Sequence, residues 1–436
     1  MKTSGQTLYS KAKKIIPGGN QLLSKRPEMF HPKNWPSYFM KSSGIKIWDL
    51  DKNCYKDFSI MSVGQCPLGY ANKKINNKIK KIIDLGNTST LNSFEEVQLA
   101  KKLAKIHKGL DMVRFAKTGG EANSIAIRIA RAFKNRSIVV ASGYFGWQDW
   151  YLSANLKDPK SLNQLLIKGL KTNGIPKELA GTTIAVNNGD VEKLKKTFKK
   201  NGSKIAAIIL EVQRNDKPNL KFIKEARKLC TKHKSVLIFD EISSGFRINL
   251  GGIYLNYKLK PDMVVLGKGL GNGFPISAVI GKKKFMQHAQ TTFMSSSYWT
   301  DRIGFVAGNA LIDEFKKNNV ATYLKNIGKY FRLKFEKMRK RNGFKIFLGG
   351  VLSVPVINFN YGNKELLIKT IFIQKMLNRG FLTSNVIYLS QAHKKKDINE
   401  YIKCFEEVFI EINKNKKNLK KILDGKACHS GFQRIS

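Results

Sequence analysis

The sequence of 436 residues has few of the features that mark membrane, secreted or metal-binding proteins. No stretch reaches the roughly 18 apolar residues that a membrane helix needs. The first 19 residues lack the apolar middle of a signal peptide. Five scattered cysteines, with no CxxC pair, argue against a disulfide or zinc framework, and the six histidines show no ligand spacing. We therefore expect a cytoplasmic protein with no membrane segment and no metal.

Acidic residues are also scarce. The chain has 31 Asp and Glu against 79 Lys and Arg, a formal net charge of +48. Such a charge suits a polyanion such as nucleic acid. The lysines, however, lie in short clusters along the whole chain, and no RNA- or DNA-binding module is recognisable. We favour compositional drift over a nucleic-acid partner. The positive field could still steer an anionic substrate.

The length exceeds that of a typical single core, so we expect a large and a small domain. Residues 1–60 look like an extended N-terminal segment, residues 61–305 like the large domain and residues 306–436 like a smaller C-terminal α/β domain. We expect the basic tail after Lys414 to fray.

From about residue 112 the pattern becomes strand, loop and helix, repeated. Continuous apolar strands that alternate with helices predict an α/β fold with a mostly parallel sheet covered on both faces. Expected strands in this part are 112–115, 138–141, 205–210, 236–239 and 263–266. Elsewhere we expect a hairpin of 44–51 and 55–59, helices at 72–83, 93–107, 305–340, 364–379 and 397–413, and strands at 345–348, 352–358 and near 388–390.

In open α/β sheets, ligands bind outside the carboxyl ends of the strands. The residues at those ends provide helix amides for a phosphate, an aromatic ring, two carboxylates and a lysine. This set suits an aldehyde cofactor with a ring nitrogen and a phosphate, namely pyridoxal phosphate. The residues are Thr118 to Gly120, Tyr144, Glu211, Asp240 and Lys268.

Lys268 is the centre of this prediction. It follows a buried strand in a glycine-rich turn, PDMVVLGKGLGNGFP, at residues 261–275. An ammonium is costly to bury, and a desolvated lysine can form a Schiff base with an aldehyde. A phosphate-binding loop is excluded because Asp262 and Gly269 stand where that motif needs Gly and Ser or Thr. A GxGxxG-like spacing in the run is weak, since the usual helix and acidic partner are missing. Taken alone, the turn could also be a surface turn with one of many lysines.

Several motifs together carry a family resemblance. They are IPGG at 16–19, the glycine–glutamate–alanine turn at 119–122, GYFGWQDW at 143–150, FDEISSGFR at 239–247 and the lysine stretch. The chain resembles the class-III, pyridoxal-phosphate-dependent aminotransferases, most closely the glutamate-1-semialdehyde aminomutase-like branch, from about Tyr9 to the last helix. The resemblance implies the type I aminotransferase fold and a homodimer with shared active sites. The N-terminal segment would complete the small domain and the active-site entrance.

The resemblance also implies roles for the catalytic residues. Lys268 would hold the cofactor as a Schiff base and then act as the base that moves a proton between substrate and cofactor carbons. Asp240 would pair with the pyridine nitrogen and keep it protonated, which makes the ring an electron sink. The alternative role of Asp240 is that of a helix cap. Glu211 would lie near the substrate, or be an ordinary strand-end carboxylate.

Further residues would bind the cofactor. Thr118, Gly119 and Gly120 would hold the phosphate at a helix N-terminus. Tyr144 would stack on the ring and Ile242 would cover its other face, although either could be plain core. Ser297 is the best match to a family threonine that lends its hydroxyl to the partner subunit's phosphate.

The sequence departs from the family at four places. Gly120 replaces a hydroxyl residue of a serine–glycine–threonine turn, and Phe145 replaces a histidine. The run 21–26 replaces one that carries a substrate-carboxylate serine, although Arg26 or Lys25 could still bind an anion. The run 295–300 replaces a glycine–threonine element. These changes count against strict aminomutase activity.

We therefore expect an aminotransferase that moves an amino group between an amino donor and a carbonyl substrate, both small molecules. The alternative is glutamate-1-semialdehyde 2,1-aminomutase, which moves the group within one molecule. A remote alternative is a non-catalytic basic protein that binds nucleic acid; it gives no reason to keep both Lys268 and Asp240.

Overall fold

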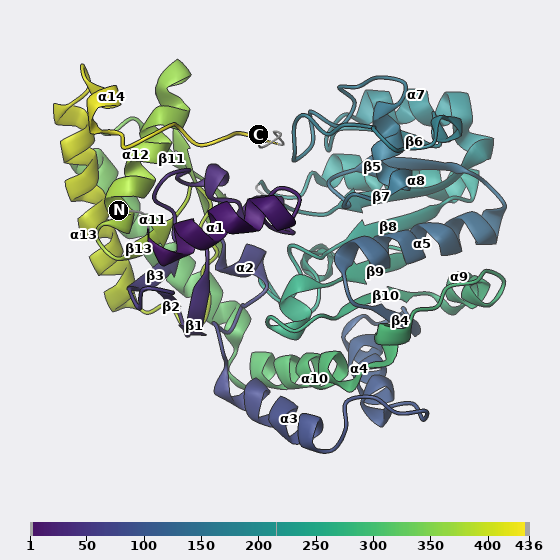
Figure 1. Cartoon of the computed structure of the whole chain (residues 1–436). Helices are drawn as coiled ribbons and strands as arrows, with labels where there is room; N and C mark the ends of the chain where they lie inside the picture. The colour runs from purple at the N-terminus through teal and green to yellow at the C-terminus, as the bar shows by residue number, and fades with distance from the viewer. Residues whose placement is uncertain (1–2, 215, 432–436) are drawn as a thin grey trace. The chain divides into compact units, whose positions relative to one another are not determined.

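The chain forms two compact units (Figure 1). The computed structural model describes residues 3–214 and 216–431. The discontinuous unit contains Met1–Asn72 and Thr322–Ser436, and the central unit contains Lys73–Ala321. The boundaries thus fall after residues 72 and 321, whereas the sequence suggested 60 and 305.

The shift of the second boundary has a simple packing reason. Helix α10 (Arg302–Lys317) lies against α3 (Lys73–Asp84) and α4 (Phe94–Ile106). Ten residues of α10 are buried, so the helix belongs to the core of the central unit. The N-terminal segment shares a sheet with the C-terminal part of the chain, because β13 pairs in parallel with β3.

The central unit is built on a seven-stranded sheet with the order β4-β10-β9-β8-β7-β5-β6. Strands β9, β8, β7, β5 and β6 are parallel, and β10 is antiparallel to both of its neighbours. The bounds are β4 Met112–Ala116, β5 Ile138–Ser142, β6 Thr183–Ala185, β7 Ile205–Glu211, β8 Val236–Asp240, β9 Met263–Leu266 and β10 Ser277–Gly281. All five predicted strands are present, and the sequence missed only β6 and β10 of this sheet.

Helices pack against the strands of this sheet, and every residue of β7, β8 and β9 is buried. Helix α5 lies over β7, β9 and β10, and its buried residues form one apolar stripe. The α-helices besides α3, α4 and α10 are α5 Gly119–Lys134, α6 Asp149–Leu152, α7 Val191–Asn201, α8 Leu220–His233 and α9 Lys283–Met286. Short 3₁₀ turns are η3 Ser153–Asn155, η4 Lys177–Leu179, η5 Gly202–Lys204, η6 Ile253–Tyr257, η7 Lys268–Gly271, η8 Gln287–Gln290 and η9 Ser297–Thr300.

The discontinuous unit has a four-stranded sheet of order β1-β2-β3-β13 and a hairpin of β11 and β12. Its aromatic-rich core includes stacked Phe405 and Phe409. Strands are β1 Phe39–Ser43, β2 Lys46–Asp49, β3 Cys54–Phe58, β11 Ile346–Val351, β12 Val354–Phe359 and β13 Phe381–Thr383. Helices and 3₁₀ turns are α1 Ser4–Ile15, η1 Leu23–Lys25, η2 Pro27–Met29, α2 Met61–Gly64, α11 Val320–Asn342, η10 Gly362–Lys364, α12 Glu365–Leu377, α13 Lys395–Lys414 and α14 Leu419–Ile422.

Two expectations about secondary structure were wrong. The helix expected at 305–340 is two helices, because Asn319 adopts a left-handed conformation (φ 45°) between α10 and α11. The segment near 388–390 is not a strand. Its amides donate to two separate segments instead of one ladder: Tyr388 to the carbonyl of Ser59 and Leu389 to that of Ser353.

The tail after Lys414 does not fray as expected within the described residues. The Cys428 amide donates to the Thr370 hydroxyl at 2.8 Å, and the His429 amide donates to the Glu28 carbonyl at 2.7 Å. Cys428 is itself buried. The last five residues, 432–436, lie outside the described part of the chain.

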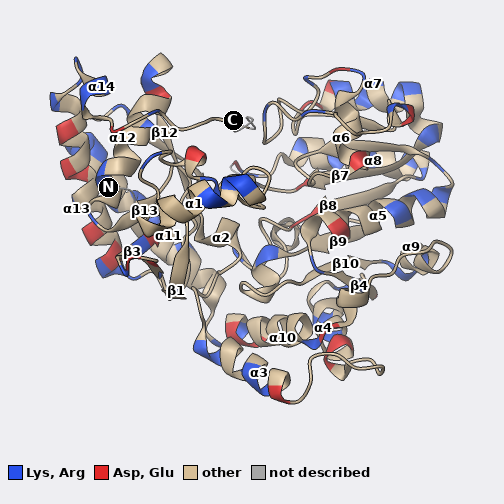
Figure 2. Ribbon diagram, in the orientation of Figure 1, with Lys and Arg blue, Asp and Glu red and all other residues tan. Residues whose placement is uncertain are grey.

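Lysine and arginine residues lie along helices of both units, with acidic residues among them (Figure 2). No helix within residues 3–214 and 216–431 combines the length and apolar character needed to span a membrane. The same described ranges contain no cluster of His, Cys, Asp and Glu side chains that could hold a metal ion.

Candidate active site

Lys268 begins η7, directly after β9 and Gly267. Its backbone is left-handed, with φ of 42°. A side chain in that region costs on the order of 1–3 kcal/mol, which the buried surroundings must compensate. Lys268 is half-buried, and its Nζ donates to the Ser243 hydroxyl at 2.8 Å. The lysine amine is therefore held at a fixed place near the end of β8, where Ser243 follows the strand.

Asp240 is the last residue of β8 and is only 4% exposed. Its carboxylate accepts from the Asn123 side-chain amide at 2.9 Å and from the Ile242 backbone amide at 2.8 Å. Burial and the nearby Glu211 charge raise the pKa of Asp240 to about 7, against the opposing effects of Asn123, the Ile242 amide and Lys268. Both hydrogen bonds come from neutral groups, so the site favours an additional cationic partner.

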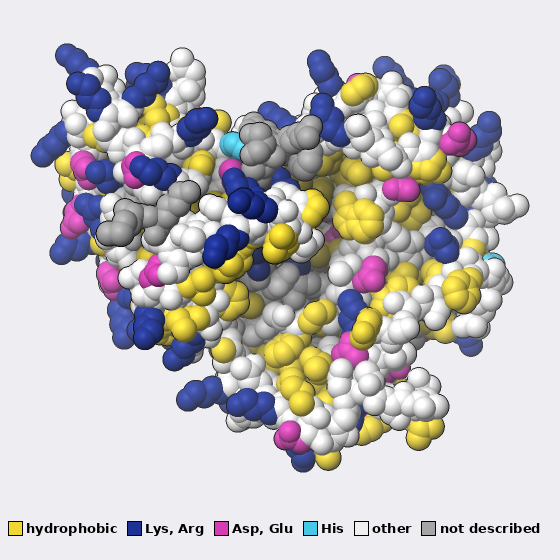
Figure 3. All heavy atoms as spheres, viewed as in Figure 1, with side chains coloured by type: hydrophobic (Ala, Val, Ile, Leu, Met, Phe, Trp, Pro, Cys, Tyr) yellow, Lys and Arg dark blue, Asp and Glu magenta, His cyan; other side chains and the backbone are white. Residues whose placement is uncertain are grey.

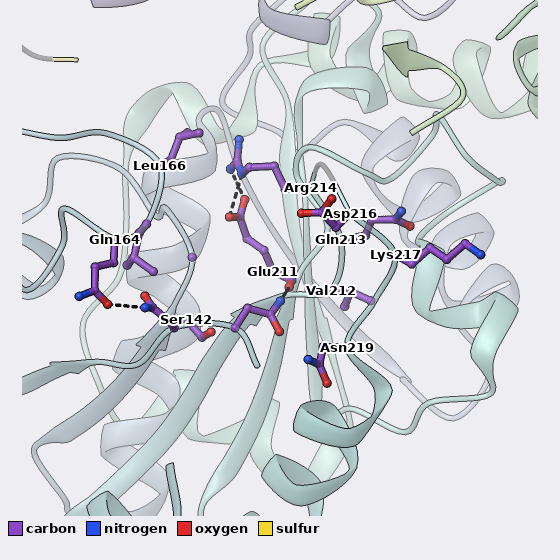
Figure 4. A pocket seen from close by; sticks show the side chains of 14 residues that line it. Ser142, Gln164, Leu166, Glu211, Val212, Gln213, Arg214, Asp216, Lys217 and Asn219 are labelled. Carbon is purple, nitrogen blue, oxygen red and sulfur yellow. Dashed lines mark hydrogen bonds and ion pairs between the residues drawn. The ribbon is translucent and has the colours of Figure 1, made fainter. Parts of the chain in front are cut away.

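Glu211 is the last residue of β7 and pairs in register with Asp240. The Arg214 guanidinium donates two hydrogen bonds to the Glu211 carboxylate, and the Nε–Oε2 distance is 2.9 Å. The Tyr144 amide also donates to Glu211, at 3.2 Å. Figure 4 shows Arg214 and Glu211 facing each other in a pocket of about 540 Å³. Its lining includes Ser142, Gly143 and Asn188 but neither Lys268 nor Asp240.

The turn at 118–120 forms the N-terminus of α5. Thr118 is the N-cap residue, and its hydroxyl accepts from the Glu121 amide at 3.3 Å. Gly119 and Gly120 open the helix, where backbone amides have no intrahelical acceptor. A Cβ on Gly119 would lie 2.7 Å from Ile242 Cδ1, and one on Gly267 would lie 3.5 Å from Ile242 Cγ2. Ile242 therefore lies between the helix N-terminus and the turn that carries Lys268.

The remaining predicted site residues are Tyr144, Ser297 and Arg26. Tyr144 is half-buried and packs edge-on against Tyr151, with ring centroids 6.0 Å apart. Burial raises the pKa of Tyr144. Ser297 is exposed at the start of η9 in the central unit. Arg26 belongs to the discontinuous unit, where its guanidinium lies against Gly18. The cofactor roles of Tyr144 and Ser297 and the substrate role of Arg26 stay predictions.

Sequence reasoning missed four polar residues in this region: Asn123, Gln148, Arg214 and Ser243. Asn123 had a signal, because it is a polar residue within the apolar stripe of α5 and is only 1% exposed. Ser243 lies three residues after Asp240 in a motif that was recognised. Arg214 and Gln148 lie in loops, where no periodicity indicates which way a side chain points.

The residues present fit pyridoxal phosphate. Asp240 offers a buried carboxylate without a cationic hydrogen-bond donor, as a protonated pyridine nitrogen requires. Lys268 offers an amine at the start of η7, after the neighbouring strand β9, and the N-terminus of α5 offers amides for a phosphate. Gly120 and Gly146 accommodate the Gln148 side chain beside that helix end, because added Cβ atoms would overlap it. All of these groups lie within the central unit.

Comparison with known proteins defines the class. The model of the family "Aminotransferase class-III" matches residues 31–418. The chain therefore belongs to the class-III aminotransferases and is a pyridoxal-phosphate-dependent aminotransferase. This confirms the resemblance, the fold class and the type of cofactor that the sequence predicted.

Individual relatives span nearly the whole chain. A glutamate-1-semialdehyde 2,1-aminomutase of Wigglesworthia glossinidia brevipalpis is 31% identical, over 94% of this chain and 98% of the relative. A 3-aminobutyryl-CoA aminotransferase of Cloacimonas acidaminovorans (strain Evry) is 28% identical, over 94% and 97%. In structure, the chain is similar to the FumI protein of Sphingopyxis sp. MTA144 in its PLP internal aldimine form. That match has a TM-score of 0.86 and 24% identity, over 95% of this chain and 97% of the other, and it shows the fold.

Proposed function

We propose that this aminotransferase carries out its reaction at the carboxyl ends of β7, β8 and β9, with Lys268 as the catalytic amine and Asp240 as the partner of the cofactor ring. The observation that carries the proposal is that a held amine and a buried carboxylate lie at the carboxyl ends of two neighbouring parallel strands, β9 and β8. When bound, pyridoxal phosphate supplies an electron sink that stabilises negative charge at the substrate carbon.

Lys268 has two tasks in this proposal. Its amine would hold the cofactor covalently. The same amine would serve as the general base that accepts a proton from the substrate carbon, a role that contributes roughly 10²–10⁴-fold to a rate. Ser243 accepts a hydrogen bond from Nζ at 2.8 Å, so it holds the amine in position for both tasks.

Asp240 holds a proton on the ring nitrogen. Asn123 and the Ile242 amide fix the orientation of its carboxylate. A cation placed against Asp240 lowers its pKa again, because the charge pair compensates for burial. Thr118, Gly119 and Gly120 would hold the phosphate at the α5 N-terminus through the amides of Gly119 and Gly120, because the Thr118 amide donates to Glu121, while Tyr144 and Ile242 would enclose the ring.

The proposed substrate region contains one acidic and one basic side chain. Glu211 and Arg214 line the pocket of about 540 Å³ as a bidentate pair. An anionic substrate group can take Glu211's place on Arg214, and Glu211 can then accept from an amino group. Arg26 remains a candidate for a substrate anion. The donor and acceptor are therefore proposed to be small polar molecules, at least one of them a carboxylate.

Intramolecular transfer is the second candidate. It is favoured by the 31%-identical relative named glutamate-1-semialdehyde 2,1-aminomutase. Leu22 and its neighbours, which replace the family's serine-containing run, count against it. Incubation with glutamate-1-semialdehyde alone separates the two: an aminomutase forms 5-aminolevulinate without a second amino donor or acceptor, and the proposed aminotransferase does not.

The test of the main proposal is a visible absorbance spectrum of the protein with added pyridoxal phosphate. We expect a cofactor band that one amino donor bleaches, and no such band from covalent attachment in Lys268→Ala. A matched control is Lys282→Ala, which removes a lysine paired with Asp262 on the same sheet but away from the carboxyl ends. Failure of every donor in the panel to change the spectrum of the wild-type protein would contradict amino transfer.

We also propose a homodimer in the cytoplasm. The central unit exposes large apolar side chains, including Leu91 (81%), Phe293 (83%) and Tyr298 (75%), and Figure 3 shows hydrophobic side chains at the surface. Contiguous exposed apolar surface marks interaction sites. Ser297, next to Tyr298, is the residue that would reach a partner's phosphate. Light scattering should give twice the monomer mass, and a monomer with full activity would contradict the proposal.

A further inference from the structure

The phosphate end of the site is short of side-chain donors. Gly120 has no side chain where a hydroxyl was expected. The Thr118 hydroxyl, the other candidate, donates to Glu121 Oε2 at 3.0 Å and accepts from the Glu121 amide at 3.3 Å. Glu121 also accepts from the amides of Lys117 and Thr118. The helix end therefore offers backbone amides, but its one hydroxyl is already engaged in the cap.

One side chain lies in the space that Gly120 leaves open. A Cβ on Gly120 would overlap the Gln148 amide nitrogen and would lie 2.9 Å from the Gln148 Cδ and Oε1 atoms. A Cβ on Gly146 would overlap Gln148 Oε1. The Gln148 amide is thus packed between two glycine backbones, one of them in the first turn of α5. Gly146 has φ of 113°, which also favours glycine there.

The segment that carries Gln148 is tied to the same helix end. Trp150 Nε1 donates to the Ser124 hydroxyl at 3.1 Å, and that hydroxyl donates to the Gly120 carbonyl at 3.0 Å. Trp150 is buried. This chain of bonds fixes α6, and with it Gln148, beside the first turn of α5. The position of the amide is therefore set by the fold and does not depend on a flexible loop.

The Gln148 side chain is incompletely bonded. Its Oε1 is buried without a hydrogen-bond partner among the described residues. Its Nε2, the donor of the amide, lies against Gly120. Gln148 also lines a hollow of about 410 Å³ with Ser124, Arg128, Arg131 and Asp149, a lining that does not include Thr118, Gly119 or Gly120. An amide held in this way beside a helix N-terminus is suited to donate to an anion.

We propose that the Gln148 side-chain amide donates to the phosphate of pyridoxal phosphate and replaces the hydroxyl that Gly120 lacks. The inference rests on the proposed binding of the phosphate at the α5 N-terminus. It also explains why residue 120 is glycine, because any side chain at that position would collide with the Gln148 amide. Gln148 and Gly120 then form a coupled pair, in which a change at one position is tolerated only with a change at the other.

The first experiment compares pyridoxal phosphate with pyridoxal, which lacks the phosphate. Dissociation constants are measured by titration of the purified, cofactor-free protein, with cofactor absorbance as the readout. A hydrogen bond to a charged group is worth about 1.5–3 kcal/mol, so Gln148→Ala should weaken pyridoxal phosphate binding about 10- to 100-fold. Pyridoxal binding should change less than about twofold. The matched control is Gln287→Ala, an exposed glutamine on η8, which should alter neither affinity.

The second experiment tests the coupling. Gly120→Thr should weaken pyridoxal phosphate binding in the wild-type background, because Gln148 occupies the space. In the Gln148→Ala background the same threonine has room and supplies a hydroxyl, so it should restore at least part of the lost affinity. Thermal melting and circular dichroism check that each variant is folded.

The outcomes separate the two proposals. A wild-type protein that does not bind pyridoxal phosphate would overturn both. Normal binding that Gln148→Ala leaves unchanged, or equal losses for pyridoxal phosphate and pyridoxal, would overturn the role of Gln148 alone. An equal penalty of Gly120→Thr in the two backgrounds would also overturn it, since the two residues would then act independently.

Discussion

The carboxyl ends of β7 and β8 present two buried carboxylates in very different states. Glu211 and Asp240 are partners in register on neighbouring parallel strands. Among the described residues, the Arg214 guanidinium donates to Glu211, whereas the donors to Asp240 are the neutral amides of Asn123 and Ile242. The Glu211 charge is compensated by a hydrogen-bonded guanidinium, whereas the opposite charge that acts on Asp240 is that of Lys268, which donates to Ser243.

The difference separates two kinds of site. A buried carboxylate with neutral donors gains most from a bound cation, as a protonated ring nitrogen would be. A carboxylate already paired with arginine gains little from a further cation, but the pair can exchange partners with an incoming charged group. We infer that the β8 end serves the cofactor and the β7 end the substrate.

The largest expected effect comes from removing the charge of Asp240. Asp240→Asn keeps the shape of the side chain but removes the negative charge that holds a proton on the ring nitrogen. We expect the donor half-reaction to slow by about 10²-fold or more, the loss typical of a missing electrostatic partner. Single-turnover absorbance measurements with saturating cofactor give this rate directly.

Glu241→Gln is the matched control for that variant. Glu241 is the next residue and is fully buried, but it accepts from the Tyr254 amide at 2.9 Å and from the Ser244 hydroxyl. Its role in this arrangement is to hold the loop at 252–254. The half-reaction should change less than about threefold, so equal losses in the two variants would show that burial, and not contact with the cofactor, explains Asp240.

A second, smaller effect concerns pH and stability. Burial raises the pKa of Asp240 from 3.8, and that of Glu241 from 4.5, in each case to about 7. At a pH between the ordinary pKa of these carboxyl groups and about 7, the folded, cofactor-free protein holds protons that the unfolded chain has lost. Its stability should therefore fall as pH rises from about 4 to 7 and remain low above pH 7.

Thermal melting of the cofactor-free protein between pH 5 and pH 8 tests this. We expect a decline of a few degrees in the wild type and a smaller decline in both Asp240→Asn and Glu241→Gln. Saturating pyridoxal phosphate should remove the Asp240 part of the decline, because the cofactor provides a cation, and should leave the Glu241 part. If the cofactor changed the fall in melting temperature equally in Glu241→Gln and Asp240→Asn, the assignment of Asp240 as the partner of the cofactor would be contradicted.

The strand ends were predictable because their pattern is simple. Continuous apolar runs close on Glu211, Asp240 and the Gly267–Lys268 step, and parallel strands bring such ends to one edge of the sheet. Strand β10 was missed because SAVIG begins with Ser, ends with Gly and follows a glycine- and proline-rich loop, so that only three consecutive apolar residues mark it. The antiparallel strand therefore had no sequence signal of its own.

The contacts of these residues were not predictable in the same way. Arg214 lies three residues beyond β7 in a loop, and nothing in its spacing indicates that it turns back onto Glu211. Likewise, the conflict between Gln148 and a side chain at 120 depends on how α6 packs beside α5. Sequence showed which groups are near the edge, whereas their pairing depends on tertiary packing.

The smallest expected effect would sharpen the distinction at β7. Arg214→Gln removes the cation that an anionic substrate group is proposed to take over from Glu211. Loss of one such charged contact should raise the KM for a dicarboxylic donor such as glutamate about tenfold, or about 1.4 kcal/mol. The KM for alanine and the affinity for pyridoxal phosphate should change less than about twofold, because neither depends on a second carboxylate.

Lys217→Ala is the control for Arg214, because Lys217 lines the same pocket but points away from Glu211 (Figure 4). Steady-state kinetics with glutamate and alanine, run at two salt concentrations, separate a local contact from general attraction by the basic surface. If both variants raise the KM for glutamate equally, and the effect disappears at high salt, the positive field alone attracts the substrate. In that case Arg214 serves only to neutralise Glu211, and the β7 end does not bind the substrate carboxylate directly.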